Sequence, residues 1–182
     1  EFIAAGLDQT RGWFYTLTVL GAALFDKPAF RNVIVNGMVM AEDGKKMSKS
    51  LRNYTPPDEL MESYGADALR LYAINSGLMR GEEQRFADSG VRDMVRRALL
   101  PWYNAFSFLR TYAAIDGWSP DKGQHHGNNI LDHWIRSRLQ TLKANVATEM
   151  EAYRLYNVVP QLFSFIEDLT NWYIRLNRGR FW

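Results

Sequence analysis

The apolar positions near the start of the chain form short and long runs in a pattern typical of an α/β protein. The run FIAA (2–5) ends at Gly6 and predicts a strand, and the apolar segment GWFYTLTVLGAALF that follows has the length of a helix. We expect Asp8 to be the N-cap of this helix. The β-branched run NVIVNGMVM (32–40) predicts a buried parallel strand, which completes a β-α-β unit.

Helical patterns dominate after Pro57. PPDELMESYG predicts a helix that begins at a proline and ends at Gly65, and ADALRLYAINSGLM predicts the next helix. The stretch RGEEQRF reads as a polar connection. A long amphipathic segment starts at Ala87, and Pro101 within it predicts a kink or break near Ala98 to Leu100.

A linker and a helix pair are predicted for the last third of the chain. Gly, Pro, Asn and His concentrate in GWSPDKGQHHGNN (117–129), which is typical of a linker. The remaining residues predict an antiparallel helix pair with its turn near Ala152 to Asn157. We therefore expect an α/β part followed by an all-α part, divided as 1–56, a helical region at 57–116, the linker, and a helical domain at 130–182.

Composition and charge narrow the possible functions. The chain has 182 residues, of which 47% are hydrophobic and 23% charged, as in an ordinary soluble protein, and its apolar runs are too short for a membrane span. The absence of cysteine excludes disulfides, thiolate catalysis and cysteine-bound zinc in this chain. The net charge of +2 is too small to predict nucleic-acid binding. Two local basic clusters remain: Lys45, Lys46, Lys49 and Arg52, and then Arg175, Arg178 and Arg180.

The first basic cluster lies in a loop, GKKMSKSLRN (44–53), directly after the predicted strand. Its ammonium groups and hydroxyls could surround a polyphosphate and stabilise the charge that develops on pyrophosphate when a carboxylate attacks ATP. Ligands of doubly wound folds bind at the carboxyl ends of strands, so we expect residues 6–9 and 36–50 to share one functional rim. The residues alone leave a second interpretation open, which is a solvated lysine-rich turn.

Four motifs resemble one family of enzymes. KMSKS (46–50) is identical to the second ATP-binding motif of class I aminoacyl-tRNA synthetases. DQTRGWF (8–14) resembles the corresponding stretch of isoleucyl-tRNA synthetases, and NWYIRLNRGRFW (171–182) resembles part of their anticodon-binding domain. GADALRLY (65–72) follows at about the family interval. The resemblance covers nearly the whole chain and is weakest in the predicted linker.

The resemblance implies roles for residues around the loop. Lys49 would contact the ATP phosphates, while Lys46 and the serines would shape and close the loop, and the two lysines would be the catalytic residues. The implied nucleotide-binding residues of the loop are Lys46, Met47, Ser48, Lys49 and Ser50. Mg²⁺ would accompany the ATP, and no protein metal site is expected.

The resemblance also assigns residues on the rim. Asp8 would lie near the ribose and Gln9 near the amino acid of the adenylate, and Gly6 would let the backbone approach the nucleotide. Trp13 would form a wall of the isoleucine pocket. The residues implied to lie against the adenine are Asn36, Gly37 and Met38. The implied fold of 1–56 is the second half of a Rossmann-type catalytic domain.

Simpler interpretations stand beside these roles. Asp8 could be only a helix cap, Trp13 by default would be core, and Met38 could be ordinary strand packing. An aromatic stripe in the last helix predicts bundle core rather than a platform for stacked bases; its members are Phe163, Phe165, Trp172 and Tyr173. His125 and His126 lack acidic or cysteine partners and make a poor metal site.

The chain departs from the family pattern in two ways. Ala5 stands where family members usually have a glutamate that contacts the adenylate. The family's other ATP motif, the HIGH sequence, is absent, and so is the editing domain. The start without methionine and the aromatic end lead us to expect an excised fragment, inactive alone and able to self-associate through an exposed sheet edge.

The function implied for the whole enzyme is ligation of isoleucine to its tRNA. It would activate L-isoleucine with ATP and transfer the acyl group to tRNA(Ile), as a cytoplasmic monomer. One alternative is a valyl, leucyl or methionyl relative. Another is a non-catalytic RNA-binding module that uses Arg175, Arg178 and Arg180.

Overall fold

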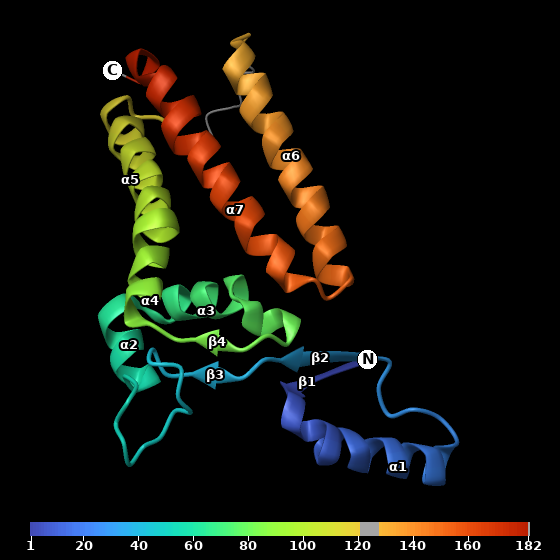
Figure 1. Ribbon diagram of the computed structural model, residues 1–182. Helices are drawn as coiled ribbons and strands as arrows, with labels where there is room; N and C mark the ends of the chain where they lie inside the picture. Colours follow the sequence, from blue (N-terminus) through green and yellow to red (C-terminus); the bar gives the residue numbers. More distant parts are fainter. Residues whose placement is uncertain (121–127, 182) are drawn as a thin grey trace. The chain divides into compact units, whose positions relative to one another are not determined.

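The computed structural model describes residues 1–120 and 128–181, and its elements are shown in Figure 1. Most of the predicted linker, with His125 and His126, lies outside the described residues. The chain divides into two compact units, Glu1–Val91 and Arg92–Trp182. In the described ranges, no helix combines the length and apolar character that a membrane span requires.

The first unit opens with the predicted β-α-β arrangement. Strand β1 (Phe2–Gly6) is followed by α1 (Trp13–Phe25) and β2 (Asn32–Asn36). The strands pair in parallel, with Phe2 opposite Asn32 and Gly6 opposite Asn36. Phe14 of α1 is buried and meets Phe30 edge to face, with ring centroids 6.2 Å apart. The prediction of a parallel β-α-β unit is confirmed.

The start of α1 differs from the prediction. A 3-10 helix, Leu7–Arg11, separates β1 from α1, and Gly12 precedes the first turn of α1. The Oε1 atom of Gln9 accepts a hydrogen bond of 3.0 Å from the backbone N–H of Trp13. Gln9 therefore caps α1, and the prediction that Asp8 is the N-cap is wrong because the intervening turn places Asp8 too early in the chain.

The predicted strand 32–40 is broken at Gly37. Strand β3 (Val39–Met40) leaves β2 and pairs in parallel with β4 (Gln84–Arg85), a strand within the predicted polar connection. Gly37 donates to the carbonyl of Leu78 over 2.8 Å, and a Cβ at this position would overlap the backbone of Glu82. The chain therefore crosses between two small sheets where only glycine fits.

The prediction that this strand is buried is also wrong. Each sheet in the described part of the chain has two strands, so the β1–β2 sheet has two open edges, whereas Met40 of β3 also forms an isolated antiparallel bridge with Lys46. Val33 in β2 is 44% exposed. An apolar, β-branched sequence makes a strand here, but the chain provides little to cover it.

Helices complete the first unit, although the single helix predicted for ADALRLYAINSGLM ends at Asn75 and is followed, after Ser76, by a 3-10 helix. They are α2 (Pro57–Tyr64), α3 (Ala66–Asn75), a 3-10 helix at Gly77–Arg80, and α4 (Asp88–Met94), whose last turn belongs to the second unit. Pro57 opens α2, and Gly65, with φ of 85°, separates α2 from α3. The buried side chains of this part include Leu60, Ala68, Leu78 and Val91.

The kink or break predicted near Ala98 to Leu100 takes the form of a π-helical turn, and the helix is not interrupted there. A π-helical turn, Val95–Leu99, precedes α5 (Leu100–Ile115). Proline lacks the N–H that would continue the α-helical ladder and crowds the preceding turn. The extra residue of the π turn accommodates both effects.

The last two helices form the predicted antiparallel pair. Helix α6 (Ile130–Glu151) is joined by a turn to α7 (Val158–Glu167), which continues as a π-helix, Asp168–Ile174. Figure 1 shows α6 and α7 running in opposite directions. The Glu149 carboxylate fixes the turn by accepting hydrogen bonds from Arg154 at 2.6 and 3.0 Å and from Asn157 at 2.8 Å. These partners lower the pKa of Glu149 to about 2.

The core of the second unit uses part of the predicted aromatic stripe. Phe165 is buried with Ile135, Val158, Val159 and Ile166. Trp172 is 58% exposed, so the prediction that it belongs to the bundle core is wrong for the described part of the chain. Its neighbour Tyr173 points to the other side and hydrogen-bonds Asp132.

Candidate functional site

The register of the β1–β2 sheet places the carboxyl ends of both strands at one edge, which is the rim expected from the sequence. Because Gly6 lies opposite Asn36, the residues after both strands leave the same edge of the sheet. This edge carries Asp8 and Gln9 on one side and Gly37 and Met38 on the other. The structure thus confirms that the turn after β1 and the end of β2 lie together, as the strand-end rule predicts.

Two apolar side chains near this rim stay exposed. Trp13 is 55% exposed, and so is Met38, although the Met38 carbonyl accepts a ladder hydrogen bond of 2.9 Å from Gln84. The interpretation of Trp13 as core and of Met38 as strand packing is therefore wrong within this chain. Both side chains remain available for contact with something else.

A tight turn begins the lysine loop one short strand beyond the rim. The Ala41 N–H donates to the Lys45 carbonyl over 2.8 Å, and Gly44 takes φ of 79° between them. Lys45 is paired with Asp43, with 3.6 Å between Nζ and Oδ2. Of the three lysines in the loop, Lys45 therefore forms its ion pair within the turn itself.

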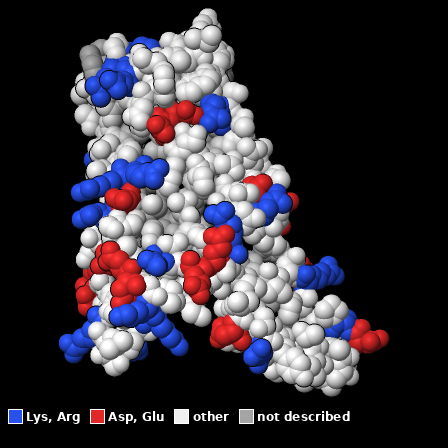
Figure 2. Space-filling model, viewed as in Figure 1, with Lys and Arg blue, Asp and Glu red and all other residues white. Residues whose placement is uncertain are grey.

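The rest of the loop is closed at its base by Asn53. The Asn53 Oδ1 atom accepts from the Ser48 N–H over 2.9 Å, and its Nδ2 donates to the Lys46 carbonyl over 3.2 Å. At the tip, the hydroxyls of Ser48 and Ser50 lie 2.8 Å apart. Lys46 and Lys49 are exposed. Figure 2 shows basic side chains at the lower left, where this loop lies in Figure 1.

Two residues near the loop were missed in the sequence. Asn53 is part of the stretch GKKMSKSLRN, but it is uncharged and carries no signal of its own. Arg85 in β4 lies against the turn, so close that a Cβ on Gly44 would meet its Nε at 3.1 Å. Only the pairing of β3 with β4 brings Arg85 to the loop.

The described side chains form no cluster of three or more acidic, histidine or cysteine residues that could hold a metal ion. A Mg²⁺ ion at this loop would have to arrive with the phosphates that bind it, because the loop itself offers mainly cations and hydroxyls.

The arginines of the second basic cluster differ in their interactions. Arg180 donates from both terminal nitrogens to the Asp132 carboxylate, each over 2.8 Å, and Tyr173 donates to the same carboxylate over 2.8 Å. The hydrogen bond from Arg180 is the main reason that the pKa of Asp132 falls to about 2. Asn177, which is 3% exposed, accepts from Arg180 over 2.9 Å. All three arginines are exposed, but Arg180 is paired with Asp132 of α6 and so links the end of the chain to that helix.

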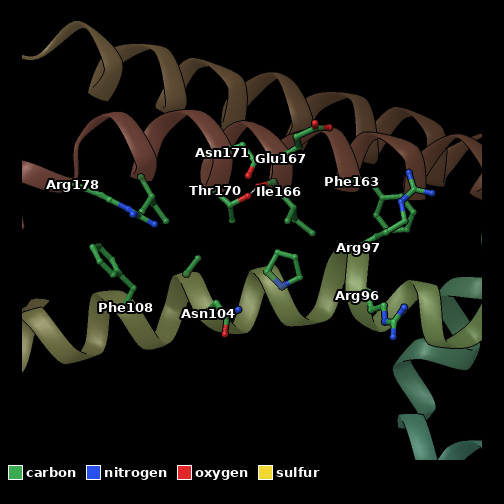
Figure 3. A pocket seen from close by; sticks show the side chains of 13 residues that line it. Arg96, Arg97, Asn104, Phe108, Phe163, Ile166, Glu167, Thr170, Asn171 and Arg178 are labelled. Atoms are coloured by element: carbon green, nitrogen blue, oxygen red, sulfur yellow. Dashed lines mark hydrogen bonds between the residues drawn. The ribbon is translucent and has the colours of Figure 1, made fainter.

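A groove of about 620 Å³ lies along α5 and the π-helical continuation of α7. Figure 3 shows Arg178 at one end and Arg96 and Arg97 at the other. The Arg97 guanidinium stacks over the Phe163 ring at 5.5 Å from the centroid. Asn104 and Thr170 line the middle. The groove is thus polar and basic at both ends, which suits an extended anion.

Two family descriptions match the chain. The description "tRNA synthetases class I (I, L, M and V)" matches residues 1–85, and "Anticodon-binding domain of tRNA ligase" matches residues 132–182. The first match contains the rim and the lysine loop, and the second contains α7 and most of α6.

Solved structures with a similar fold come from the same class. The chain resembles the methionyl-tRNA synthetase of Mycobacterium tuberculosis bound by methionyl-adenylate, with a TM-score of 0.76 at 19% identity over 99% of this chain and 34% of that one. It also resembles the LeuRS of Agrobacterium radiobacter in a ternary complex with tRNA and LeuAMS, with a TM-score of 0.69 at 23% identity over 99% of this chain and 23% of that one. At these identities the likeness concerns the fold.

Relatives of higher identity carry one name. The chain is 58% identical to an isoleucine–tRNA ligase of Bdellovibrio bacteriovorus over 100% of its own length and 17% of the relative. It is 53% identical to the cytoplasmic isoleucine–tRNA ligase of Schizosaccharomyces pombe over 99% of its length and 18% of the relative. The chain thus spans less than a fifth of the relatives it matches. Residues 1–85 therefore match the class I tRNA synthetases, residues 132–182 match the anticodon-binding domain of tRNA ligases, and the sequence of the whole chain is similar to the isoleucine–tRNA ligases.

Proposed function

We propose that this chain is the part of an isoleucine–tRNA ligase that holds the phosphates of ATP while isoleucine is activated. The observation that carries the proposal is the lysine loop, a closed turn after β3 with Lys46 and Lys49 exposed. A carboxylate that attacks the α-phosphate of ATP displaces pyrophosphate, on which negative charge accumulates. Cations at the tip of the loop stabilise that charge more in the transition state than in the ground state.

The rim supplies the remaining contacts of the proposed site. Asp8 would hold the ribose and Gln9 the amino acid of the adenylate. Asn36, Gly37 and Met38 would lie against the adenine. The exposed face of Trp13 would form one wall of the isoleucine pocket, because an indole offers an apolar surface to a branched side chain. Mg²⁺ would enter with ATP, bound to its phosphates.

Gln9 has a second role that constrains the first. Its Oε1 caps α1 and its Nε2 donates to Asp8 over 3.0 Å, so the side chain is held before any ligand arrives. The proposed amino-acid contact would therefore come from a side chain that is already oriented, or it would require Gln9 to release the cap.

The test is isoleucine-dependent ATP–pyrophosphate exchange by the complete ligase that contains this chain. Lys49→Ala is expected to lower the turnover of exchange about 100-fold, because a charge-stabilising group is lost from the transition state. Lys143→Ala, which removes an exposed lysine from α6, is the matched control and should leave exchange unchanged. Full exchange by Lys49→Ala would refute the phosphate role of the loop.

The amino acid is tested in the same assay. The proposal predicts that isoleucine supports exchange better than valine, leucine or methionine. A preference for one of the other three would keep the loop mechanism and overturn the isoleucine assignment. The 182-residue chain alone should show no exchange, since the HIGH motif is absent from its sequence.

A second candidate function, contact with tRNA, is supported by the groove of the second unit. Arg96, Arg97 and Arg178 line it, and Arg175 lies exposed nearby in sequence. Arginine side chains that neutralise phosphates release counterions, so the affinity should fall steeply with salt. Replacing Arg178 with alanine should reduce the slope of log affinity against log salt by about one. An unchanged slope would exclude Arg178 as a phosphate contact.

Arg180 should not behave as a phosphate contact in this experiment. Its guanidinium is occupied by Asp132, and removing it should weaken the bundle instead of the salt-dependent part of binding. The proposed tRNA surface therefore differs from the simple cluster of arginines near the end of the sequence.

The cellular setting of the proposed ligase is the cytoplasm. The Schizosaccharomyces pombe relative, which is named a cytoplasmic enzyme, supports this setting.

A further inference from the structure

Asn53 joins two distant backbone groups of the lysine loop. Its acceptor Oδ1 holds the Ser48 N–H at 2.9 Å, and its donor Nδ2 holds the Lys46 carbonyl at 3.2 Å. One side chain thus pairs with both a donor and an acceptor of the loop backbone, next to the bridge that Lys46 forms with Met40 of β3. The two groups flank Met47, so Asn53 fixes the backbone between Lys46 and Lys49.

The backbone before Asn53 turns back so that its side chain can reach these groups. The Arg52 N–H donates to the Ser48 carbonyl over 3.0 Å, and Arg52 adopts φ of 48° in the left-handed region. A left-handed residue reverses the direction of the chain, as at the end of many helices. The segment from Ser48 to Arg52 is therefore one closed turn with Lys49 on it, and Asn53 locks that turn to Lys46.

We propose that Asn53 is a positioning residue for nucleotide binding, which sets the loop conformation that presents Lys46 and Lys49 together to a triphosphate. The inference rests on the proposed function and adds a residue that bears no charge and contacts no phosphate. Without Asn53, the Ser48 N–H and Lys46 carbonyl turn to water and the loop samples many conformations. The lysines keep their charge, but the nucleotide must then order the loop as it binds. The lost conformational entropy lowers the affinity.

The experiment uses the 182-residue chain labelled with ¹⁵N and titrated with MgATP, with backbone amide shifts as the readout. Asn53→Ala should weaken MgATP binding about tenfold, the effect of losing two hydrogen bonds that order the loop. Amide hydrogen exchange at Ser48 should become faster in the same variant. Asn145→Ala, an exposed asparagine of α6, is the matched control and should change neither quantity.

A conservative variant separates positioning from a general loss of structure. Asn53→Asp keeps an acceptor for the Ser48 N–H but loses the donor to the Lys46 carbonyl. It should restore slow exchange at Ser48, which is the diagnostic readout for this variant, because the added carboxylate by itself weakens binding of the anionic nucleotide. Shifts of amides in α2 and α3 should match the wild type in both variants, which shows that the unit remains folded.

The outcomes distinguish this inference from the function on which it rests. If Lys49→Ala weakens MgATP binding and Asn53→Ala does not, the positioning role is wrong and the phosphate role of the loop stands. If neither variant changes binding, or if the wild type shows no shifts in the loop, both are wrong. Fast exchange at Ser48 already in the wild type would also overturn the positioning role.

Discussion

At the residue scale, the loop combines charged groups that meet a ligand with uncharged or strained groups that hold them. Lys46 and Lys49 are exposed, while Asn53 and the backbone of Arg52 shape the turn. Arg52 is one of the non-glycine residues with positive φ in the described chain, together with Asp26 and Tyr153. A long side chain in this region carries a steric cost of about 1 kcal/mol. The turn is therefore maintained at the expense of local strain.

This strain can be measured by replacing Arg52. Arg52→Gly should raise the free energy of unfolding of the first unit by up to about 1 kcal/mol, because glycine adopts positive φ without a clash. Urea unfolding followed by the backbone amide signals of the first unit measures the change. Arg52→Ala removes the same charge but keeps a Cβ, so it should stay within about 0.5 kcal/mol of the wild type. Equal stabilisation by glycine and alanine would attribute the effect to charge and contradict the strain.

At the element scale, the sequence predicts most helices and strands but not the contacts between them. Pro57, Gly65 and Pro101 mark real boundaries because proline and glycine act on the local backbone, whatever lies around them. The break of strand 32–40 at Gly37 depends on the carbonyl of Glu82, which is distant in sequence. The two-residue strand β4 depends wholly on its partner β3. No local pattern could have predicted either feature.

The candidate site shows the same division. The charged and glycine-bounded loop is visible in the sequence because cations and hydroxyls at close spacing are a chemical signal. Asn53 and Arg85 are not visible, since their importance comes from where the fold places them. The misassigned cap at Asp8 has a similar cause, because a 3-10 turn ahead of α1 moves the capping role to Gln9.

The elements of the second unit are joined by a polar network with a pH-dependent strength. The partners of Asp132 depress its pKa from 3.8 to about 2, so the charged form is favoured in the folded state. The contribution to stability is complete above about pH 4, where an unfolded aspartate is also ionised, and it is lost as the pH falls toward 2. The network ties the first turn of α6 to Tyr173 and Arg180.

Asp132→Asn should test this network. At neutral pH the variant is expected to unfold at lower urea concentration than the wild type, as judged by helical circular dichroism. The difference should shrink between pH 4 and pH 2, because protonation then removes the same charge from the wild type. Asp116→Asn changes an exposed carboxylate outside the network and is the control. A difference that does not depend on pH would mean that the ion pair with Arg180 contributes little.

At the scale of the whole molecule, the chain leaves much apolar surface and both sheet edges uncovered. Exposed apolar residues occur in both units, and they include Trp13, Leu24, Phe25, Trp102 and Phe106. The strand edges of β1 and β2 are open among the described residues. Surfaces of this kind favour pairing with another chain. They are consistent with the finding that the chain spans less than a fifth of the relatives it matches.

Self-association of the chain is therefore expected. Its sedimentation coefficient should rise with protein concentration, because unpaired strand edges and apolar faces can meet between copies. Val33→Lys, at a position that is 44% exposed in β2, should reduce the rise. A sedimentation coefficient independent of concentration in the wild type would contradict the expectation.

Binding of ATP phosphates by the lysine loop can be observed by titrating the wild-type chain and Lys49→Ala with MgATP. In the wild type, the backbone amides of Lys46 to Ser50 should shift with added MgATP, together with those of the rim at Gly6 to Gln9 and Asn36 to Met38. In Lys49→Ala the shifts in the loop should be strongly reduced at the same nucleotide concentration. Loop amides that do not shift in the wild type, or that shift equally in the variant, would contradict the account.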